Sequence, residues 1–401
     1  MRRPRVCIVR QQDVYELPVR REAEALVAAG YDVETLLMRY PDRRRNTTIN
    51  GVRITSLPVR LHRTSKVRYI ADYVSFLAFA SAILTVRHLR RRYAVVQVNT
   101  MPDFLVYAAM IPKLLGARVL LYMKEPVPEL AETLFGRSPT LVRILVGIEQ
   151  RALRFADHAV TVTNELKQQF VERGAAESHI SVVLNGVDAA TLIPKGWSPP
   201  QSPEKDGFVV FCHGTIEERY GQDTIVEAVA LLRDELPDLR FVLAGKGSYT
   251  ATIAELADAR GVGDIYRDEG FVSLERLADL LAAADVGVVA QKASSYSHLV
   301  QTNKMMDYWI FGLPVIASRL RSTAAEYDDD TLEYYEPGDA RDLARAIRRL
   351  YHDPARREQL AQRGRKALER NGWETQRKTF LGIYTRLLRR DEKALVATRP
   401  D

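Results

Sequence analysis

The sequence predicts an α/β fold of two doubly wound domains, and three observations lead to this prediction. Apolar runs rich in Val, Ile and Leu alternate with longer amphipathic stretches, which is typical of parallel strands separated by covering helices. The alternation stops at one Pro-rich segment and then starts again. The length of 401 residues, with 46% hydrophobic and 27% charged side chains, is suitable for two globular domains.

The first domain is expected over residues 1–190. Gly30 closes its first predicted helix, and the Asn50-Gly51 pair predicts a turn before the third predicted strand. The predicted strands are residues 5–10, 32–38, 52–57, 95–99, 118–122, 158–162 and 180–184, and predicted helices include residues 19–29, 104–115 and 141–155.

A linker and a second domain are expected to follow. Residues 191–207 contain four prolines and two glycines without apolar periodicity, which indicates a linker. The second domain is predicted over residues 208–372, with strands at 208–212, 240–244, 286–290 and 313–317. A last helical stretch, residues 373–390, has the length to fold back on the first domain.

Charge and cysteine content limit the functional classes. Residues 1–190 carry 28 Lys and Arg against 18 Asp and Glu, whereas the remainder carries 30 against 33. The basic half indicates either an anionic partner, such as a membrane surface or a phosphorylated ligand, or only a solubilising surface. The basic residues are scattered, so no nucleic-acid partner is expected. Cys7 and Cys212 lie in apolar runs and are expected to be buried strand residues. No secretory signal is recognised, and a cytoplasmic protein is expected.

Residues 69–86 form an almost uncharged stretch followed by several arginines. Its 18 residues are at the short limit for crossing a bilayer and include Asp72. Because strands are predicted on both sides, a helix buried against the sheet is the favoured interpretation. The alternative is that its basic end rests on an anionic membrane surface, which would place the protein peripherally at the inner face of the membrane.

Candidate ligand-binding residues follow the predicted strands of the second domain. Glycines let the backbone approach a ligand closely, and an arginine can hold a phosphate with paired donors. Thr302 or Asn303 can cap a helix whose first turn carries Lys304, and Asp307 lies one turn later on the same face. This arrangement predicts a diphosphate site with a carboxylate for ribose hydroxyls, or alternatively a surface ion pair between Lys304 and Asp307. The residues concerned are Gly214, Arg219, Gly245, Gly247, Thr302, Asn303, Lys304 and Asp307.

These motifs resemble those of glycosyltransferase family 4. The stretch NKMMDYWIFGLPVIAS, residues 303–318, is similar to the helix of that family that bears an acidic residue and holds the sugar nucleotide. Seven further motifs occur in the family's order along the chain, at residues 19–33, 99–121, 154–174, 182–188, 213–229, 241–248 and 280–290. The resemblance implies a GT-B fold, in which two Rossmann-like domains face each other across a cleft.

The resemblance also implies roles for individual residues. Arg219 and Lys304 would contact the donor diphosphate and Asp307 the ribose, with the Gly245–Gly247 turn and Phe271 near the base. Cations on the departing phosphates stabilise the charge that develops there, so the resemblance implies no metal and no other cofactor. The first domain would bind the acceptor, a glycan or a lipid-linked saccharide.

The chain departs from the family pattern at several positions. Leu299 stands where the family usually has its first acidic residue, Asp307 replaces the commoner Glu, and Tyr220 stands where most members have Lys. No histidine matches the acceptor-side positions of related sequences. In the corresponding stretch, Lys124, Glu125 and Glu129 are the candidate catalytic side chains, or they belong to a polar loop without a catalytic role.

The function expected from the sequence is therefore a glycosyltransferase. It would move a sugar from a nucleoside-diphosphate sugar to an acceptor hydroxyl, with retention, in cell-envelope or exopolysaccharide synthesis. Two alternatives remain open. One is a sugar-nucleotide epimerase or phosphorylase on the same fold. The other is a relative that binds a sugar nucleotide without turnover.

Overall fold

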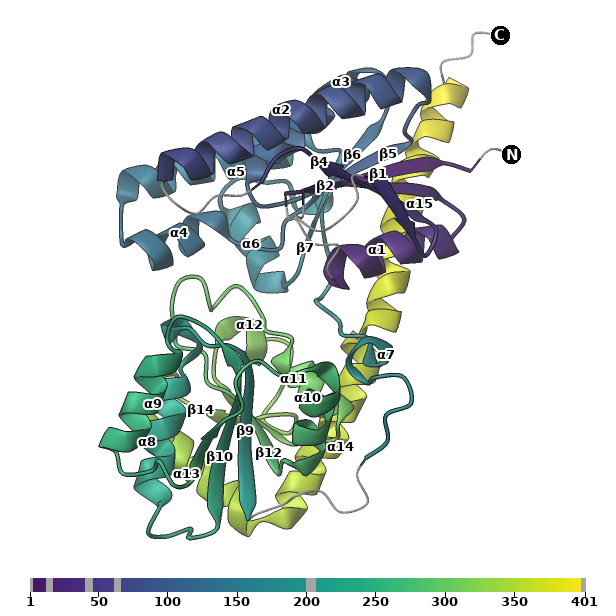
Figure 1. The fold of residues 1–401 in the computed structure, drawn as a ribbon. Helices are drawn as coiled ribbons and strands as arrows, with labels where there is room; N and C mark the ends of the chain where they lie inside the picture. Colours follow the sequence, from purple (N-terminus) through teal and green to yellow (C-terminus); the bar gives the residue numbers. More distant parts are fainter. Residues whose placement is uncertain (1–2, 12–16, 40–45, 61–65, 200–206, 398–401) are drawn as a thin grey trace. The chain divides into compact units, whose positions relative to one another are not determined.

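The computed structural model describes residues 3–11, 17–39, 46–60, 66–199 and 207–397. It divides into two compact units (Figure 1). The first unit comprises residues 1–183 and 377–401, and the second comprises residues 184–376. Residues 200–206 of the predicted linker lie outside the described residues, whereas residues 184–199 belong to the second unit. There Trp197 donates a hydrogen bond from Nε1 to Asp279 Oδ1 at 2.9 Å and packs edge-on against Phe311.

An eight-stranded sheet forms the centre of the first unit, in the order β3-β4-β2-β1-β5-β6-β7-β8. All neighbouring strands are parallel except β3 and β4, which form a hairpin. Its turn is the Asn50-Gly51 pair, and both residues have positive φ, at 47° and 80°. The strands are β1 Arg5–Arg10, β2 Asp32–Met38, β3 Asn46–Ile49, β4 Val52–Leu57, β5 Val95–Asn99, β6 Arg118–Tyr122, β7 His158–Thr161 and β8 Ile180–Val182.

Helices connect β1 to β2, β4 to β5, β5 to β6, β6 to β7 and β7 to β8, as parallel strands require. The connection from β2 to its parallel neighbour β4 instead includes strand β3. The segment predicted as one helix at residues 104–115 is instead a 3₁₀ helix, η1, followed by the short helix α3. The helices are α1 Leu17–Ala28, α2 Lys66–Arg90, η1 Asp103–Ala109, α3 Met110–Leu114, α4 Val127–Phe135, α5 Pro139–Phe155, α6 Asn164–Glu172, η2 Glu177–His179 and α15 Trp373–Ala397.

Helix α15 returns to the first unit after the second is complete (Figure 1). From Arg377 onward it belongs to the first unit, where Phe380 stacks on Tyr122 of β6. Tyr384 donates a hydrogen bond from its hydroxyl to Gln97 Oε1 of β5 at 2.6 Å. Both aromatic side chains are fully buried, so helix α15 contributes to the core of the first unit.

The second unit is a six-stranded parallel sheet in the order β11-β10-β9-β12-β13-β14. Apolar side chains from both faces of β9 pack into two separate clusters, as a doubly wound sheet requires. Its strands are β9 Phe208–Thr215, β10 Leu239–Lys246, β11 Tyr266–Asp268, β12 Val286–Val289, β13 Val315–Ser318 and β14 Glu333–Tyr335. Its helices are α7 Ala189–Leu192, η3 Glu218–Tyr220, α8 Gln222–Leu232, α9 Thr250–Ala259, α10 Leu274–Ala283, α11 Lys304–Ile310, α12 Arg321–Ala324, α13 Ala340–His352 and α14 Pro354–Asn371.

The prediction of a buried helix at residues 69–86 is only partly right. Helix α2 forms and buries Tyr73, Phe76 and Leu84, but its opposite face remains exposed. By length and composition the stretch from Ile70 to Arg90 could cross a membrane, and 28% of it is buried. In the described part of the chain, no other helix meets that test.

Candidate functional site

Two glycine-containing loops touch at the carboxyl ends of β9 and β10. A Cβ atom at Gly245 would lie 1.8 Å from the carbonyl oxygen of Gly214, and one at Gly247 would lie 1.8 Å from that of Ile216. Any larger residue would therefore force the two loops apart. The glycines predicted from the sequence therefore allow the backbones of neighbouring strand ends to lie in direct contact.

Two cations converge beside these loops. The Nζ of Lys304 and the guanidinium carbon of Arg219 each lie 4.8 Å from the ring centroid of Tyr220. Lys304 also lies along Gly214, where an added Cβ would come within 2.9 Å of its Cε. In the described ranges neither cation has a carboxylate within ion-pair distance. Both charges are therefore available to an anionic ligand, and the alternative of an ion pair between Lys304 and Asp307 is not found.

Helix α11 positions Lys304 and Asp307. The backbone N–H of Lys304 donates to Thr302 Oγ1 at 3.4 Å, whereas Asn303 makes no capping hydrogen bond through its side chain. Of the two predicted capping residues, Thr302 is therefore the one whose side chain accepts a hydrogen bond from the first turn of the helix. The helix ends at Ile310, and Gly312 follows with a φ of 73°. Leu299, at the position of the family's first acidic residue, is buried.

Asp307 lies next to His213, a buried histidine that was not among the predicted site residues. The Oδ2 of Asp307 is 3.6 Å from Nε2 of His213, whose ring packs against Phe211 and Tyr308. Burial, aided by Lys304, lowers the pKa of His213 to about 3, so the ring is neutral at physiological pH. Burial also raises the pKa of Asp307 to about 7, although Lys304 opposes this shift. Hydrogen bonds donated by a ligand would lower the pKa of Asp307 and so favour its ionised form.

Phe271 is the exposed aromatic side chain near the same edge. It is 76% exposed, and Nζ of Lys246 lies 4.5 Å from its ring centroid. The adjacent turn is held by Glu217, which accepts hydrogen bonds from the backbone N–H and the hydroxyl of Ser248 at 3.2 and 2.6 Å. An exposed ring beside a fixed turn provides a flat apolar surface for a planar ligand group.

In the first unit, the candidate Lys124 belongs to a buried polar network. Its Nζ lies 2.6 Å from Glu22 Oε1, and burial lowers the pKa of Lys124 to about 8 against the opposing effect of Glu22. The other oxygen of Glu22 accepts hydrogen bonds from Gln97 and Asn99 at 2.7 and 2.9 Å. Because Gln97 also accepts from Tyr384, the network joins α1, β5, the loop after β6 and α15.

Glu125 and Glu129 differ in their surroundings. Glu125 is half-buried. Glu129 is buried and hydrogen-bonded to Arg173, whose other terminal nitrogen lies 3.0 Å from Glu149 Oε2. Desolvation raises the pKa of Glu149 to about 7, and the neighbouring Glu129 adds to this shift, whereas the shared Arg173 opposes it. Glu129 therefore has a structural ion pair that the sequence did not indicate.

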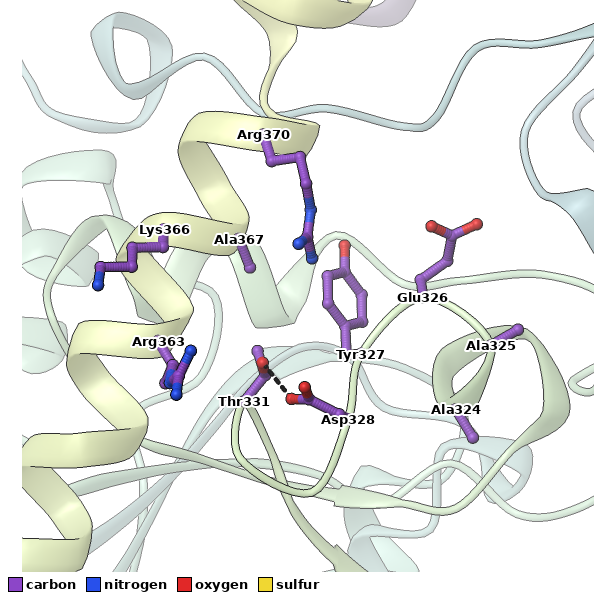
Figure 2. A pocket seen from close by; sticks show the side chains of 10 residues that line it. All are labelled: Ala324, Ala325, Glu326, Tyr327, Asp328, Thr331, Arg363, Lys366, Ala367 and Arg370. Atoms are coloured by element: carbon purple, nitrogen blue, oxygen red, sulfur yellow. Dashed lines mark hydrogen bonds between the residues drawn. The ribbon is translucent and has the colours of Figure 1, made fainter.

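A separate pocket of about 360 Å³ lies elsewhere in the second unit. Figure 2 shows Arg363, Lys366 and Arg370 on successive turns of α14, with Asp328 on the facing loop hydrogen-bonded to Thr331 at 2.7 Å. None of the residues predicted to bind the donor lines this pocket. Its exposed cations therefore provide matched controls for substitutions at Arg219 and Lys304.

Sequence reasoning missed His213 and Glu22. His213 directly follows the apolar run of β9 and stands at the carboxyl end of a strand, so its position was a usable signal. Glu22 lies in a helical pattern 102 residues before its partner Lys124, and no local feature of the sequence connects the two.

Comparisons with known protein families agree with this architecture. The model described as "Glycosyl transferase 4-like domain" matches residues 16–186, and the one described as "Glycosyl transferases group 1" matches residues 197–367. The chain belongs to the family 4 glycosyltransferases, and its two α/β units have the GT-B fold.

Individual relatives are more distant. A D-inositol 3-phosphate glycosyltransferase of Thermomonospora curvata is 26% identical over 257 residues, and the match spans 59% of this chain and 58% of that protein. The lipopolysaccharide core biosynthesis glycosyltransferase LpsE of Rhizobium meliloti is 33% identical over 41% of this chain and 45% of its own length. The structure of HepE from Anabaena in complex with UDP-glucose matches with a TM-score of 0.72 and 14% identity, covering 95% of this chain and 99% of that one.

Proposed function

We propose that this protein is a glycosyltransferase that moves a sugar from a nucleoside-diphosphate sugar to an acceptor hydroxyl with retention of configuration. The observation that carries the proposal is the convergence of Lys304 and Arg219, without carboxylate partners among the described residues, beside Gly214. Two cations next to an exposed backbone turn match the needs of a diphosphate. Asp307 would accept hydrogen bonds from the ribose, and Phe271 would lie near the base.

The reaction breaks the bond between the sugar C1 and the oxygen of the terminal phosphate. The electron pair passes to that oxygen, where Lys304 and Arg219 stabilise the developing charge. The acceptor oxygen forms a bond to C1 on the same face of the sugar as the departing phosphate, which gives retention. The proton of the acceptor hydroxyl goes to that phosphate. The name of LpsE supports an acceptor in cell-envelope glycan synthesis, and the UDP-glucose complex of HepE supports UDP-glucose as the first donor to test.

A ligand screen tests this proposal directly. The melting temperature is measured with UDP, GDP, ADP, dTDP and their sugars, because a ligand well above its Kd stabilises the folded state. A shift with one nucleotide, larger with one attached sugar, supports a donor site and identifies the donor. Product analysis then separates transfer from epimerisation, since only transfer forms a bond between the sugar and the acceptor. The absence of any shift would contradict the proposal.

We expect donor affinity to rise with pH through about 7. The ionised carboxylate of Asp307 is the form that accepts ribose hydroxyls, and the pKa of Asp307 is raised to about 7. Between pH 6 and 8 the ionised fraction increases about tenfold, so the apparent Kd should fall by about the same factor. Calorimetric titration with UDP-glucose measures this, because its diphosphate is fully ionised throughout the range.

The variant Asp307→Asn is the control for this pH dependence. It cannot ionise, so its weaker binding should not vary with pH over the same range. An unchanged slope in Asp307→Asn would assign the titration to another group.

We further propose that the reaction needs no metal, because two protein cations serve the diphosphate. Among the described residues, no group of three or more His, Cys, Asp or Glu side chains is arranged to hold a metal ion. The expected result is that the turnover rate with UDP-glucose is unchanged by EDTA. A loss of turnover that Mg²⁺ or Mn²⁺ restores would contradict this part of the proposal.

A further inference from the structure

The outward face of α2 is apolar along most of its length. The helix has 25 residues and is therefore about 37 Å long. Its inward side chains, including Phe76 and Leu84, are buried in the first unit. Its outward large side chains Ile70, Val74, Phe79, Val86 and Leu89 are 44 to 68% exposed. A helix on the surface of a water-soluble domain normally carries polar residues on this side.

Helix α3 extends the apolar surface. It packs beside α2 (Figure 1), and its region leaves four more large apolar residues 37 to 76% exposed. The α2–α3 face consists of Ile70, Val74, Phe79, Val86, Leu89, Met110, Ile111, Leu114 and Leu115. In the described ranges, these nine residues are most of the fifteen large hydrophobic side chains that are exposed. Such clustering marks a contact surface rather than scattered exposure.

The charges around this face are basic. The single acidic residue of α2 is Asp72, which is buried and lies 3.3 Å from the Nε of Arg68. Arg90 and Arg92 are exposed at the other end of the helix, and neither has a carboxylate partner in the part of the chain that the structure describes. An apolar face with arginines at its ends is complementary to a lipid bilayer that has an apolar interior and anionic headgroups.

A pocket lined by arginines opens at the edge of the α2–α3 face. It has a volume of about 360 Å³, and Phe79 belongs both to the face and to its wall. Arg39, Arg60 and Arg68 line it, together with Asp72, the ion-pair partner of Arg68. The pocket therefore offers the guanidinium groups of Arg39 and Arg60 to a ligand, beside an arginine that is already paired. Paired N–H donors of arginine match phosphate oxygens. The pocket is therefore suited to a phosphate-bearing headgroup held at the same surface.

A bilayer-spanning α2 and a two-fold dimer both fit the α2–α3 face less well than a lipid surface does. If α2 crossed a bilayer, Phe76, Ala80 and Leu84 would have to leave the core in which they are fully buried. In a two-fold dimer through this face, the arginines at its ends would meet a surface whose exposed side chains on α2 and α3 include no carboxylate. An anionic lipid surface satisfies both the apolar face and its arginines.

We propose that the α2–α3 face docks the protein on an anionic lipid bilayer, with α2 lying in the interface and the arginine pocket taking a lipid phosphate. This docking involves the first unit alone and does not depend on the proposed donor site. It goes beyond the proposed function because it places the acceptor side of the enzyme at a membrane surface.

Co-sedimentation of the full-length protein with vesicles tests the proposal. We expect binding to phosphatidylcholine vesicles that contain phosphatidylglycerol, weaker binding to pure phosphatidylcholine, and a decline with rising salt. The double variant Val74→Glu/Val86→Glu places two carboxylates on the face and should lower partitioning at least tenfold. Arg90→Gln/Arg92→Gln should lower it about fivefold for each arginine, and only with anionic vesicles.

The matched control is Leu231→Glu/Leu274→Glu, which changes two exposed apolar residues of the second unit. It should bind vesicles as the unmodified protein does. Circular dichroism and the melting temperature verify that all variants are folded. The thermal shift with UDP-glucose reports on the second unit separately, so a failed donor site and a failed membrane face give different results.

Two outcomes would overturn the docking proposal. One is vesicle binding that is absent in the unmodified protein or unaffected by Val74→Glu/Val86→Glu. The other is a concentration-dependent dimer, seen by analytical ultracentrifugation, that this variant dissociates while vesicles do not bind. The second result would show that another copy of the chain covers the face.

Discussion

Replacing Lys304 with glutamine should lower kcat with UDP-glucose by about 10²- to 10³-fold, the usual cost of removing one donor from the site of developing charge. Lys304 has no carboxylate partner among the described residues and lies along Gly214, so it is placed to contact a diphosphate. Binding of UDP should weaken much more than binding of uridine, because only UDP carries the phosphates. Steady-state kinetics and calorimetry measure both effects.

The control for Lys304→Gln is Lys366→Gln, which removes a cation from the separate pocket on α14 (Figure 2). Its kcat and nucleotide binding should be unchanged. The melting temperature of Lys304→Gln without ligand should also stay close to that of the unmodified protein, because no ion pair within the described ranges is lost. Equal losses of affinity for UDP and for uridine would contradict the proposed contact with the phosphates.

Lys124→Met should destabilise the first unit by about 3–5 kcal/mol, the range found when one partner of a buried ion pair is removed. The side chain of Glu22 is 1% exposed, and Lys124 Nζ lies 2.6 Å from it. Methionine fills a similar volume but leaves the Glu22 carboxylate buried without its cation. Urea denaturation, followed by a probe in the first unit, measures the change in the free energy of unfolding.

Two variants make this measurement specific. Adding Glu22→Gln to Lys124→Met removes the uncompensated charge and should recover part of the lost stability. Arg233→Met breaks an ion pair with Asp264 that is exposed to solvent, and should leave stability essentially unchanged. Turnover of Lys124→Met is measured well below its melting temperature, so that a catalytic role of Lys124 is seen separately. A destabilisation under about 1 kcal/mol would show that the pair is not structural.

The parts of the fold that are local in sequence could be predicted. Strands β1, β2, β4, β5 and β6 have the predicted bounds, because each is a short apolar run between turn residues. The glycine-containing loops after β9 and β10 could be located for the same reason, since glycines and cations directly follow these strands in the sequence. The short strands β3, β11 and β14 were missed, because their sequences NTTI, YRD and EYY lack the apolar run by which equally short strands were recognised.

Features that depend on distant residues were beyond the sequence. Lys124 was proposed as a catalytic candidate, but its pairing with Glu22 arises only when α1 and the loop after β6 meet in the folded unit. The same limit applies to α2. Its composition is that of a buried helix, and only the packing reveals that one face is exposed.

Helix α15 determines the order in which the two units can fold during synthesis. The second unit is complete once residue 376 has been made, whereas the first lacks Phe380 and Tyr384 until those later residues emerge. The usual order, in which the N-terminal domain folds first, is therefore reversed for completion of the core. Until then the ring of Tyr122 and the amide of Gln97 lack their partners on α15. A nascent chain of this protein must keep an unfinished first unit from aggregating while it completes the second.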